Sequence, residues 1–296
     1  MTSSSHPPHG RVLVGYDGSP PAVIALDAAV TEARCRGAAL EILCGWPWSK
    51  RLSPDYGMRD DVGTLLFNSA QRTMDAAVDR ARSRAPDTPV TPVLTTEAAA
   101  RALLRQGRNA SLTVLGTRGY GGFAGLLLGS VSLRVAAHCV TPLMVVRREP
   151  EPPHRTIVLG LASEADTEAL RFAFDEAVRR DAALRVLHTW QFPAPHGEVA
   201  RPAQLTWEEV QALRKAAEAV PQYAVTSLRE KYPQVRADAQ AVCQDPARAL
   251  IQASEEADVI VLAAHRRPRH FGLQLGPVTH ALLHHARCPV VLVPSD

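Results

Sequence analysis

An internal repeat constrains the fold of this 296-residue chain more than any other feature. Apolar runs in the first half recur in the second half in the same order, and from residue 110 onward the matching residues lie a constant 147 positions apart. Order and spacing kept over this length indicate a duplicated domain. The matched pairs are residues 11–15 with 156–160, 39–46 with 183–190, 110–115 with 257–262, and 140–146 with 287–293.

Within the first half, short apolar runs alternate with segments of helical periodicity. This alternation predicts an α/β fold in which a parallel sheet is covered by helices on both faces, through right-handed crossovers. Pro89 and Pro92 flank or interrupt the third run and remove backbone donors, so that strand is expected at a sheet edge. The expected strands are residues 11–15, 39–44, 90–94, 112–115 and 142–146, and the expected helices are residues 20–36, 65–84, 98–106 and 130–139.

The repeat and the proline content set the expected domain boundaries. Residues 1–10 are rich in Ser, His and Pro and are expected to be a disordered tail, not a signal peptide. Residues 11–149 and 156–296 form the two expected domains, each near the usual domain size. Residues 150–155, with three prolines, are the expected linker.

The composition excludes several classes of protein. No segment approaches the roughly 18 apolar residues of a membrane span, so no membrane partner is expected. The formal charge of +3 is spread without a long basic block, which argues against a nucleic acid partner. Five cysteines without a Cys-x-x-Cys pair are typical of reduced thiols. A cytoplasmic location is therefore expected.

A glycine-rich loop follows the fourth expected strand. It has the spacing Gly116-x2-Gly119-x9-Gly129-Ser130, and a helical pattern begins at its end. Glycine lets a backbone approach a ligand closely, and a helix start offers free N–H groups and the positive end of its dipole. The loop is suited to a phosphate chain, although it is neither a Walker A loop nor Gly-x-Gly-x-x-Gly. The alternative is a flexible turn.

This loop resembles the nucleotide loop of the ATP-binding branch of the universal stress protein family. The resemblance covers nearly the whole chain, while the specific loop lies in the first half alone. It implies two tandem doubly wound parallel-sheet domains of strand order 3-2-1-4-5, and an adenine nucleotide, ATP with or without Mg²⁺, as ligand. That order places the turn Asp17-Gly18-Ser19 opposite the loop that starts at Gly116.

The resemblance also suggests roles for individual residues. Asp17 would contact the adenosine part, where a carboxylate accepts a hydrogen bond from the adenine amine and repels the guanine carbonyl. Alternatively, Asp17 only closes a turn ahead of Gly18. The start of the last helix would hold the outer phosphates. The full set of expected binding residues is Asp17, Gly18, Ser19, Gly45, Leu115, Gly116, Arg118, Gly119, Gly129, Ser130, Val131 and Ser132.

The second half departs from this pattern, and we expect its nucleotide loop to be degenerate. Ala162 stands in place of Asp17, Ala263 in place of Gly116, Arg266 in place of Gly119 and Pro277 in place of Ser130; Gly276 is kept. Proline removes an N–H donor at the helix start. The segment 265–270 is basic, so a small anion or another ligand remains an alternative for this half.

No catalytic or metal-binding residues are expected. His280 and His284 have a spacing that a metal could use, with His285 beside them, but no third ligand is evident. The sequence therefore favours a regulatory or stress-response nucleotide-binding module. A slow ATPase or phosphoryl-transfer enzyme and a ligand-free scaffold remain the alternatives.

Each half ends in a short apolar strand, which would leave an exposed sheet edge. In the family, edge strands of this kind pair across a dimer. We therefore expect residues 143–146 and 290–293 to pair, so that the two halves form a pseudo-twofold pair within one chain. A homodimer and a protein partner stay open.

Overall fold

The structure is a computed structural model that describes residues 10–46, 60–119, 128–149, 152–192, 206–265 and 275–295. These residues divide into two compact units. The first unit contains the described residues up to 149 together with residues 275 and 289–294, and the second contains residues 152–265, 276–288 and 295. The expected tail at residues 1–10 lies outside the described residues, apart from Gly10.

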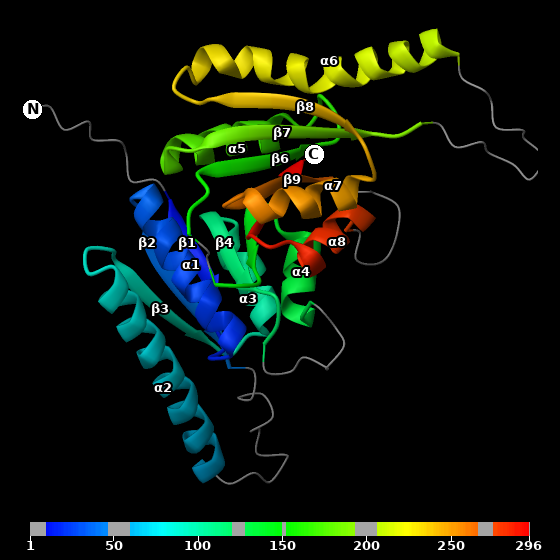
Figure 1. Ribbon diagram of the computed structural model, residues 1–296. Helices are drawn as coiled ribbons and strands as arrows, with labels where there is room; N and C mark the ends of the chain where they lie inside the picture. Colours follow the sequence, from blue (N-terminus) through cyan, green and yellow to red (C-terminus); the bar gives the residue numbers. More distant parts are fainter. Residues whose placement is uncertain are drawn as a thin grey trace, which may run out of the picture. The chain divides into compact units, whose positions relative to one another are not determined.

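The first unit is built on a mostly parallel sheet (Figure 1). Its strand order is β3-β2-β1-β4-β5, which confirms the expected order 3-2-1-4-5 and places β3, with Pro92, at one edge. At the other edge β5 pairs antiparallel with β10, and Met144 lies opposite Val291, so the expected pairing of the two final strands is confirmed. The strands are β1 (Arg11–Gly15), β2 (Ala39–Gly45), β3 (Val90–Thr95), β4 (Ala110–Gly116), β5 (Leu143–Val146) and β10 (Val290–Ser295).

Helices cover both faces of this sheet. Right-handed crossovers place α1 and α2 on one face and α3 and α4 on the other, and the members of each pair are in contact. The second helix begins at Asp60, five residues before the expected start near residue 65. The helices are α1 (Pro20–Arg36), α2 (Asp60–Arg84), α3 (Ala99–Gly107) and α4 (Ser130–His138).

The central strands are mainly apolar because both of their faces are buried. Val12, Leu13 and Val14 of β1 have no exposed surface, and the same is true of Leu112 and Val114 in β4. Strands covered on both faces show such continuous apolar runs in place of alternation. The ends of these strands are therefore the places where the sheet can present groups to a ligand.

The second unit repeats this design. Its parallel sheet has the order β9-β6-β7-β8. The 25-residue helices α2 and α6 are the longest in the described parts of the chain, and neither these nor the shorter helices have the length and apolar character that crossing a membrane requires. The elements are β6 (Thr156–Leu161), α5 (Thr167–Arg180), β7 (Ala183–Trp190), α6 (Trp207–Lys231), β8 (Ala237–Cys243), α7 (Pro246–Ala253), η3 (Ser254–Glu256), β9 (Val259–His265) and α8 (Pro277–His285).

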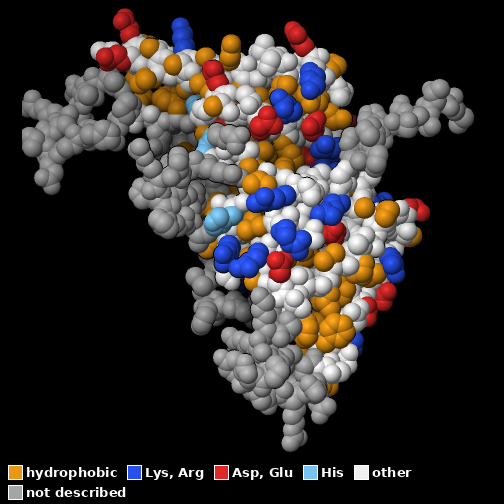
Figure 2. All heavy atoms as spheres, turned by 180° about the vertical axis from the view of Figure 1, so that it is seen from behind, with side chains coloured by type: hydrophobic (Ala, Val, Ile, Leu, Met, Phe, Trp, Pro, Cys, Tyr) orange, Lys and Arg blue, Asp and Glu red, His pale blue; other side chains and the backbone are white. Residues whose placement is uncertain are grey.

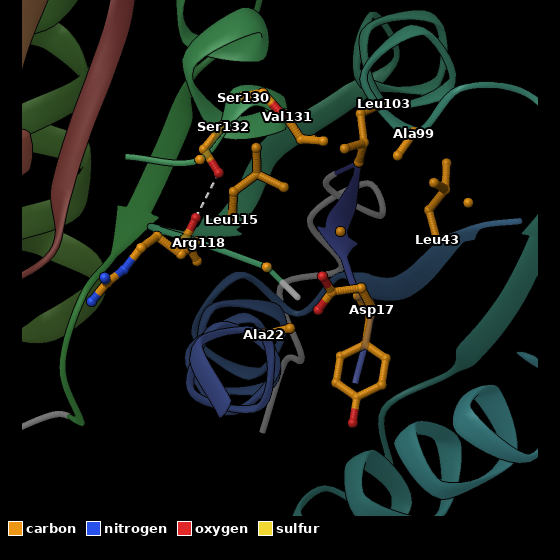
Figure 3. Close-up of a pocket in the computed structure, with 16 residues that line it drawn as sticks. Asp17, Ala22, Leu43, Ala99, Leu103, Leu115, Arg118, Ser130, Val131 and Ser132 are labelled. Carbon is orange, nitrogen blue, oxygen red and sulfur yellow. Dashed lines mark hydrogen bonds between the residues drawn. The ribbon is translucent and has the colours of Figure 1, made fainter. Parts of the chain in front are cut away.

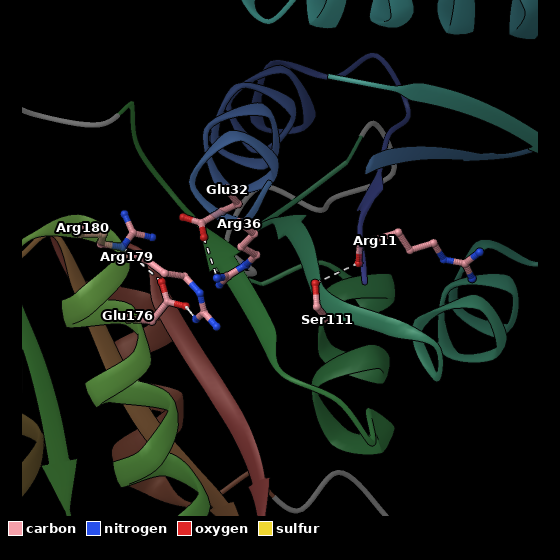
Figure 4. Close-up of polar contacts among 7 residues, drawn as sticks. All are labelled: Arg11, Glu32, Arg36, Ser111, Glu176, Arg179 and Arg180. Atoms are coloured by element: carbon pink, nitrogen blue, oxygen red, sulfur yellow. Dashed lines mark hydrogen bonds and ion pairs between the residues drawn. The ribbon is translucent and has the colours of Figure 1, made fainter. Parts of the chain in front are cut away.

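The duplication extends to a buried polar contact at the end of the first helix of each unit (Figure 4). In α1, Arg36 lies 3.1 Å from Glu32, and in α5, Arg180 lies 3.2 Å from Glu176. Both pairs have the i, i+4 spacing that brings side chains together on a helix. The repeat therefore preserves an ion pair of a buried glutamate as well as the apolar pattern.

Candidate functional site

A cavity of about 240 Å³ lies in the first unit at the carboxyl ends of β1 and β4 (Figure 3). The connections after these two strands leave in opposite directions, and ligands of open α/β sheets bind at such a reversal. All of the expected binding residues line this cavity except Gly18 and Ser19. Those two residues belong to the turn that supports Asp17.

Asp17 is the second residue after the end of β1 and takes part in that turn. Its Oδ1 accepts a 3.0 Å hydrogen bond from the backbone N–H of Ser19, and Gly18 has the left-handed φ of +82° that favours glycine. Ser19 in turn caps α1, because its hydroxyl accepts a hydrogen bond from the N–H of Ala22. Asp17 therefore closes the turn, as the simpler interpretation predicted, and its carboxylate also lines the cavity.

The glycine loop passes directly over this carboxylate. A Cβ added at Gly119 would overlap Oδ2 of Asp17, and one added at Gly116 would lie 2.6 Å from the carbonyl oxygen of Pro21. No side chain fits at either position without movement of its surroundings. The glycines thus permit a close approach between two segments that lie far apart in the sequence.

Two hydrogen bonds close the base of the loop. The N–H of Gly129 donates to the carbonyl oxygen of Thr117 at 2.6 Å, and the buried hydroxyl of Ser132 donates to the carbonyl oxygen of Gly116 at 2.7 Å. They tie the start of α4 to the end of β4. The N-cap of α4 is Gly129, which has no side chain to cover the first N–H groups. Ser130 and Val131 of this first turn line the cavity.

Part of the cavity wall was not expected from the sequence. Leu43 at the end of β2, and Ala99 and Leu103 of α3, form an apolar side (Figure 3). Gly45 packs against α3 there, since a Cβ at this glycine would lie 2.9 Å from that of Ala99. In the sequence these residues look like ordinary core residues. The helical periodicity of α3 was therefore the one sequence signal for this side of the cavity. Gly15, Tyr16 and Ala22 are the other unexpected lining residues.

Burial also affects a thiol next to the cavity. Desolvation raises the pKa of Cys44 to about 11, and the nearby charge of Asp17 adds to this effect. The thiol is therefore protonated at neutral pH. Cys44 acts as a small apolar side chain beneath the site and not as a nucleophile.

Arginines surround the site without entering it. The guanidinium of Arg118 points away from the other labelled cavity residues in Figure 3, so this residue lines the cavity mainly through its backbone. Arg101 of α3 and Arg134 of α4 are exposed. Figure 2 shows several Lys and Arg side chains near one another in the middle of the visible face, among apolar and a few acidic ones.

The comparisons with known proteins agree with this architecture. The sequence model of the universal stress protein family matches residues 9–147 and again residues 153–294. This chain belongs to the universal stress protein family. Universal stress protein Rv2623 of Mycobacterium tuberculosis is 30% identical over 293 residues, which cover 95% of each chain.

Solved universal stress proteins resemble the chain as well. The crystal structure of a universal stress protein from Archaeoglobus fulgidus covers 97% of each chain with a TM-score of 0.66 and 14% identity, and so supports the shared fold. A universal stress protein solved in complex with cAMP is 29% identical, with a TM-score of 0.34, and covers 48% of this chain and 98% of its own. The bound cAMP is a property of that protein.

In the second unit, the residues that replace Asp17, Gly116 and Ser130 lie at the corresponding places in the fold. Ala162 follows β6, Ala263 lies in β9, and Pro277 is the first residue of α8 after its N-cap Gly276. A Cβ at Gly276 would meet none of the described residues within 4 Å, in contrast to the close neighbours of Gly129. Arg266, the remaining position, lies outside the described residues, as does most of the basic segment 265–270.

Proposed function

We propose that this universal stress protein binds one adenine nucleotide, ATP, in its first unit and acts as a regulatory nucleotide-binding module. The observation that carries the proposal is the junction of Gly119, Asp17 and the start of α4 at one cavity. A carboxylate, a bare backbone and a first helical turn with uncovered N–H groups meet there. The carboxylate can accept a hydrogen bond from the adenine amine, and the bare backbone leaves room for the ribose and the phosphate chain. The uncovered N–H groups can donate to the outer phosphates of ATP.

The apolar side of the cavity suits the base. Leu43, Ala99 and Leu103 offer flat, uncharged surface, and the exocyclic amine of adenine can donate to Asp17. Guanine carries a carbonyl oxygen at that position, which the carboxylate would repel. The arginines near α4 add attraction for the phosphates, and Mg²⁺ would accompany them as their counter-ion.

The second unit is not expected to hold a nucleotide in this way. Pro277 lacks the N–H that Ser130 supplies at the helix start, and Ala162 lacks the carboxylate of Asp17. One nucleotide per chain follows from this difference.

A regulatory role is favoured over phosphoryl transfer by the cavity lining. Among the described residues that line it, Asp17 is the single carboxylate, and its Oδ1 is already engaged with the Ser19 N–H. Transfer or hydrolysis needs a base that positions the nucleophile and cationic groups on the phosphates. Any hydrolysis by this site should be slow.

The direct test is to denature the purified protein and to chromatograph the small molecules that it releases. Calorimetry with ATP and GTP on nucleotide-free protein then gives the stoichiometry and the base preference. The proposal expects one ATP per chain and weaker binding of GTP. Two equivalent sites, or no binding of either nucleotide by folded protein, would overturn it.

A further inference from the structure

The second unit has a cavity of its own, with a volume of about 250 Å³, at the carboxyl ends of β6 and β9. It occupies the same place in the fold as the cavity of the first unit, and the two are nearly equal in size. Its chemistry is different. The groups that suit a phosphate chain in the first unit are replaced here, and a buried carboxylate takes part in the lining.

The phosphate-binding elements are missing from the described part of this cavity. Ala263 carries a methyl group where the first unit has Gly116, and Pro277 has no N–H to offer at the start of α8. A polyphosphate would therefore find few donors here.

The carboxylate belongs to Asp166, which is 1% exposed. Its Oδ2 accepts hydrogen bonds from the N–H of Ala162 at 2.7 Å and of Ser163 at 3.2 Å. Because Ala162 stands in place of Asp17, the second unit regains a carboxylate at the end of its first strand from another residue. This negative charge disfavours a phosphate group in the cavity.

The second oxygen of Asp166 has a replaceable partner. Oδ1 lies 2.8 Å from Nε2 of His265, but it has no hydrogen bond of good geometry within the described residues. The His265 side chain is 47% exposed and is located at the end of β9. A buried carboxylate oxygen without an aligned donor is costly, so a ligand with a better donor gains free energy there.

The rest of the lining is mainly apolar. Leu161, Leu187, Leu250 and Leu262 contribute hydrocarbon surface, and Thr279 adds a hydroxyl. We propose that this cavity is a second ligand site, which takes a small phosphate-free organic cation. The ammonium group of the ligand donates to Oδ1 of Asp166 and displaces His265 toward solvent, while its apolar body packs on the leucines.

The test uses the full chain with labelled leucine methyl groups and two probes of matched shape, benzylammonium and the neutral benzyl alcohol. Leu250 and Leu262 report on the second cavity, and Leu103 and Leu115 report on the first. Because a hydrogen bond to a charged group contributes about 1.5 to 3 kcal/mol, benzylammonium should bind the second cavity at least roughly tenfold more tightly than benzyl alcohol. ATP should shift the methyl signals of the first cavity alone.

Two variants test the assigned contact. Asp166→Asn should abolish the preference for the cation, and His265→Ala should strengthen cation binding, because it removes the competing imidazole. The second variant keeps the test valid if Asp166→Asn unfolds the unit. Equal binding of the two probes, cation binding weakened by His265→Ala, or an ATP response of Leu250 and Leu262 would each overturn the proposal. None of these outcomes depends on whether the first unit binds ATP.

Discussion

The backbone N–H of Gly129 donates a 2.6 Å hydrogen bond to the carbonyl oxygen of Thr117. This bond joins the two ends of the glycine loop and holds the first turn of α4 beside the end of β4. Because Gly129 is the N-cap of α4 and has no side chain, the turn presents its N–H groups to the cavity. The geometry of the proposed phosphate site therefore depends on this contact.

A side chain at Gly129 should abolish ATP binding. A Cβ there would lie 3.3 Å from Cα of Arg118 and 3.4 Å from the carbonyl oxygen of Thr117, so Gly129→Val must push the loop base apart. Gly276→Val is the matched control, since a Cβ there meets no atom of the described part of the chain within 4 Å. Calorimetry should show ATP binding lost in the first variant and kept in the second, with both melting cooperatively. Retained binding in folded Gly129→Val protein would contradict the assignment.

Substitutions of Asp17 separate its two roles. Asp17→Asn keeps an acceptor for the Ser19 N–H but loses the charge, whereas Asp17→Ala loses both. We expect ATP affinity to fall by roughly tenfold to a hundredfold in Asp17→Ala, the value of a hydrogen bond to a charged group. Discrimination against GTP should shrink in both variants. If ATP and GTP titrations are unchanged in both, Asp17 only forms the turn.

Two serines of α4 should behave in opposite ways. Ser132 is buried and bonds to the carbonyl oxygen of Gly116, so Ser132→Ala should lower the free energy of unfolding by about 1 kcal/mol. Ser130 is exposed at the cavity, so Ser130→Ala should weaken ATP binding with little change in stability. Urea unfolding and ATP titration of both variants check this. A stability loss in Ser130→Ala equal to that in Ser132→Ala would contradict the prediction.

Stability should decline at alkaline pH through the buried thiol of Cys44. Its pKa is about 11 in the folded protein, while an unfolded thiol ionises near pH 8.5, so the unfolded state loses its proton first. The protonated thiol makes its full contribution to the free energy of unfolding below about pH 8.5. This contribution is lost as the pH rises toward 11, and the loss is at most about 3 kcal/mol.

The measurement is urea unfolding between pH 7.5 and 10.5. Cys44→Ala should flatten the decline, and Cys243→Ala, at an exposed position, should leave it unchanged. Cys288, whose pKa is raised to about 12 by burial, adds to the decline in every variant with Cys288 intact. Identical slopes in Cys44→Ala and the original protein would rule out this role of Cys44.

The sequence by itself determined the duplicated α/β fold and the edge position of β3. These two features follow from hydrophobic periodicity, from repeat spacing and from proline, which can be read along the chain. The pairing of the final strands was expected from their apolar edges together with the resemblance to the family. The sequence also marked the glycine loop and Asp17, because a bare backbone and a polar residue at a strand end stand out against an apolar background.

Only the tertiary structure decided which ordinary residues complete the two cavities. Leu43, Ala99 and Leu103 have the same pattern as core residues, and their place at the cavity depends on how α3 packs beside β2. Asp166 is the N-cap residue of α5, yet its carboxylate accepts from the N–H of Ala162 and meets His265 from β9. Contacts between segments distant in the chain leave no local periodicity, so folding alone brings these groups together.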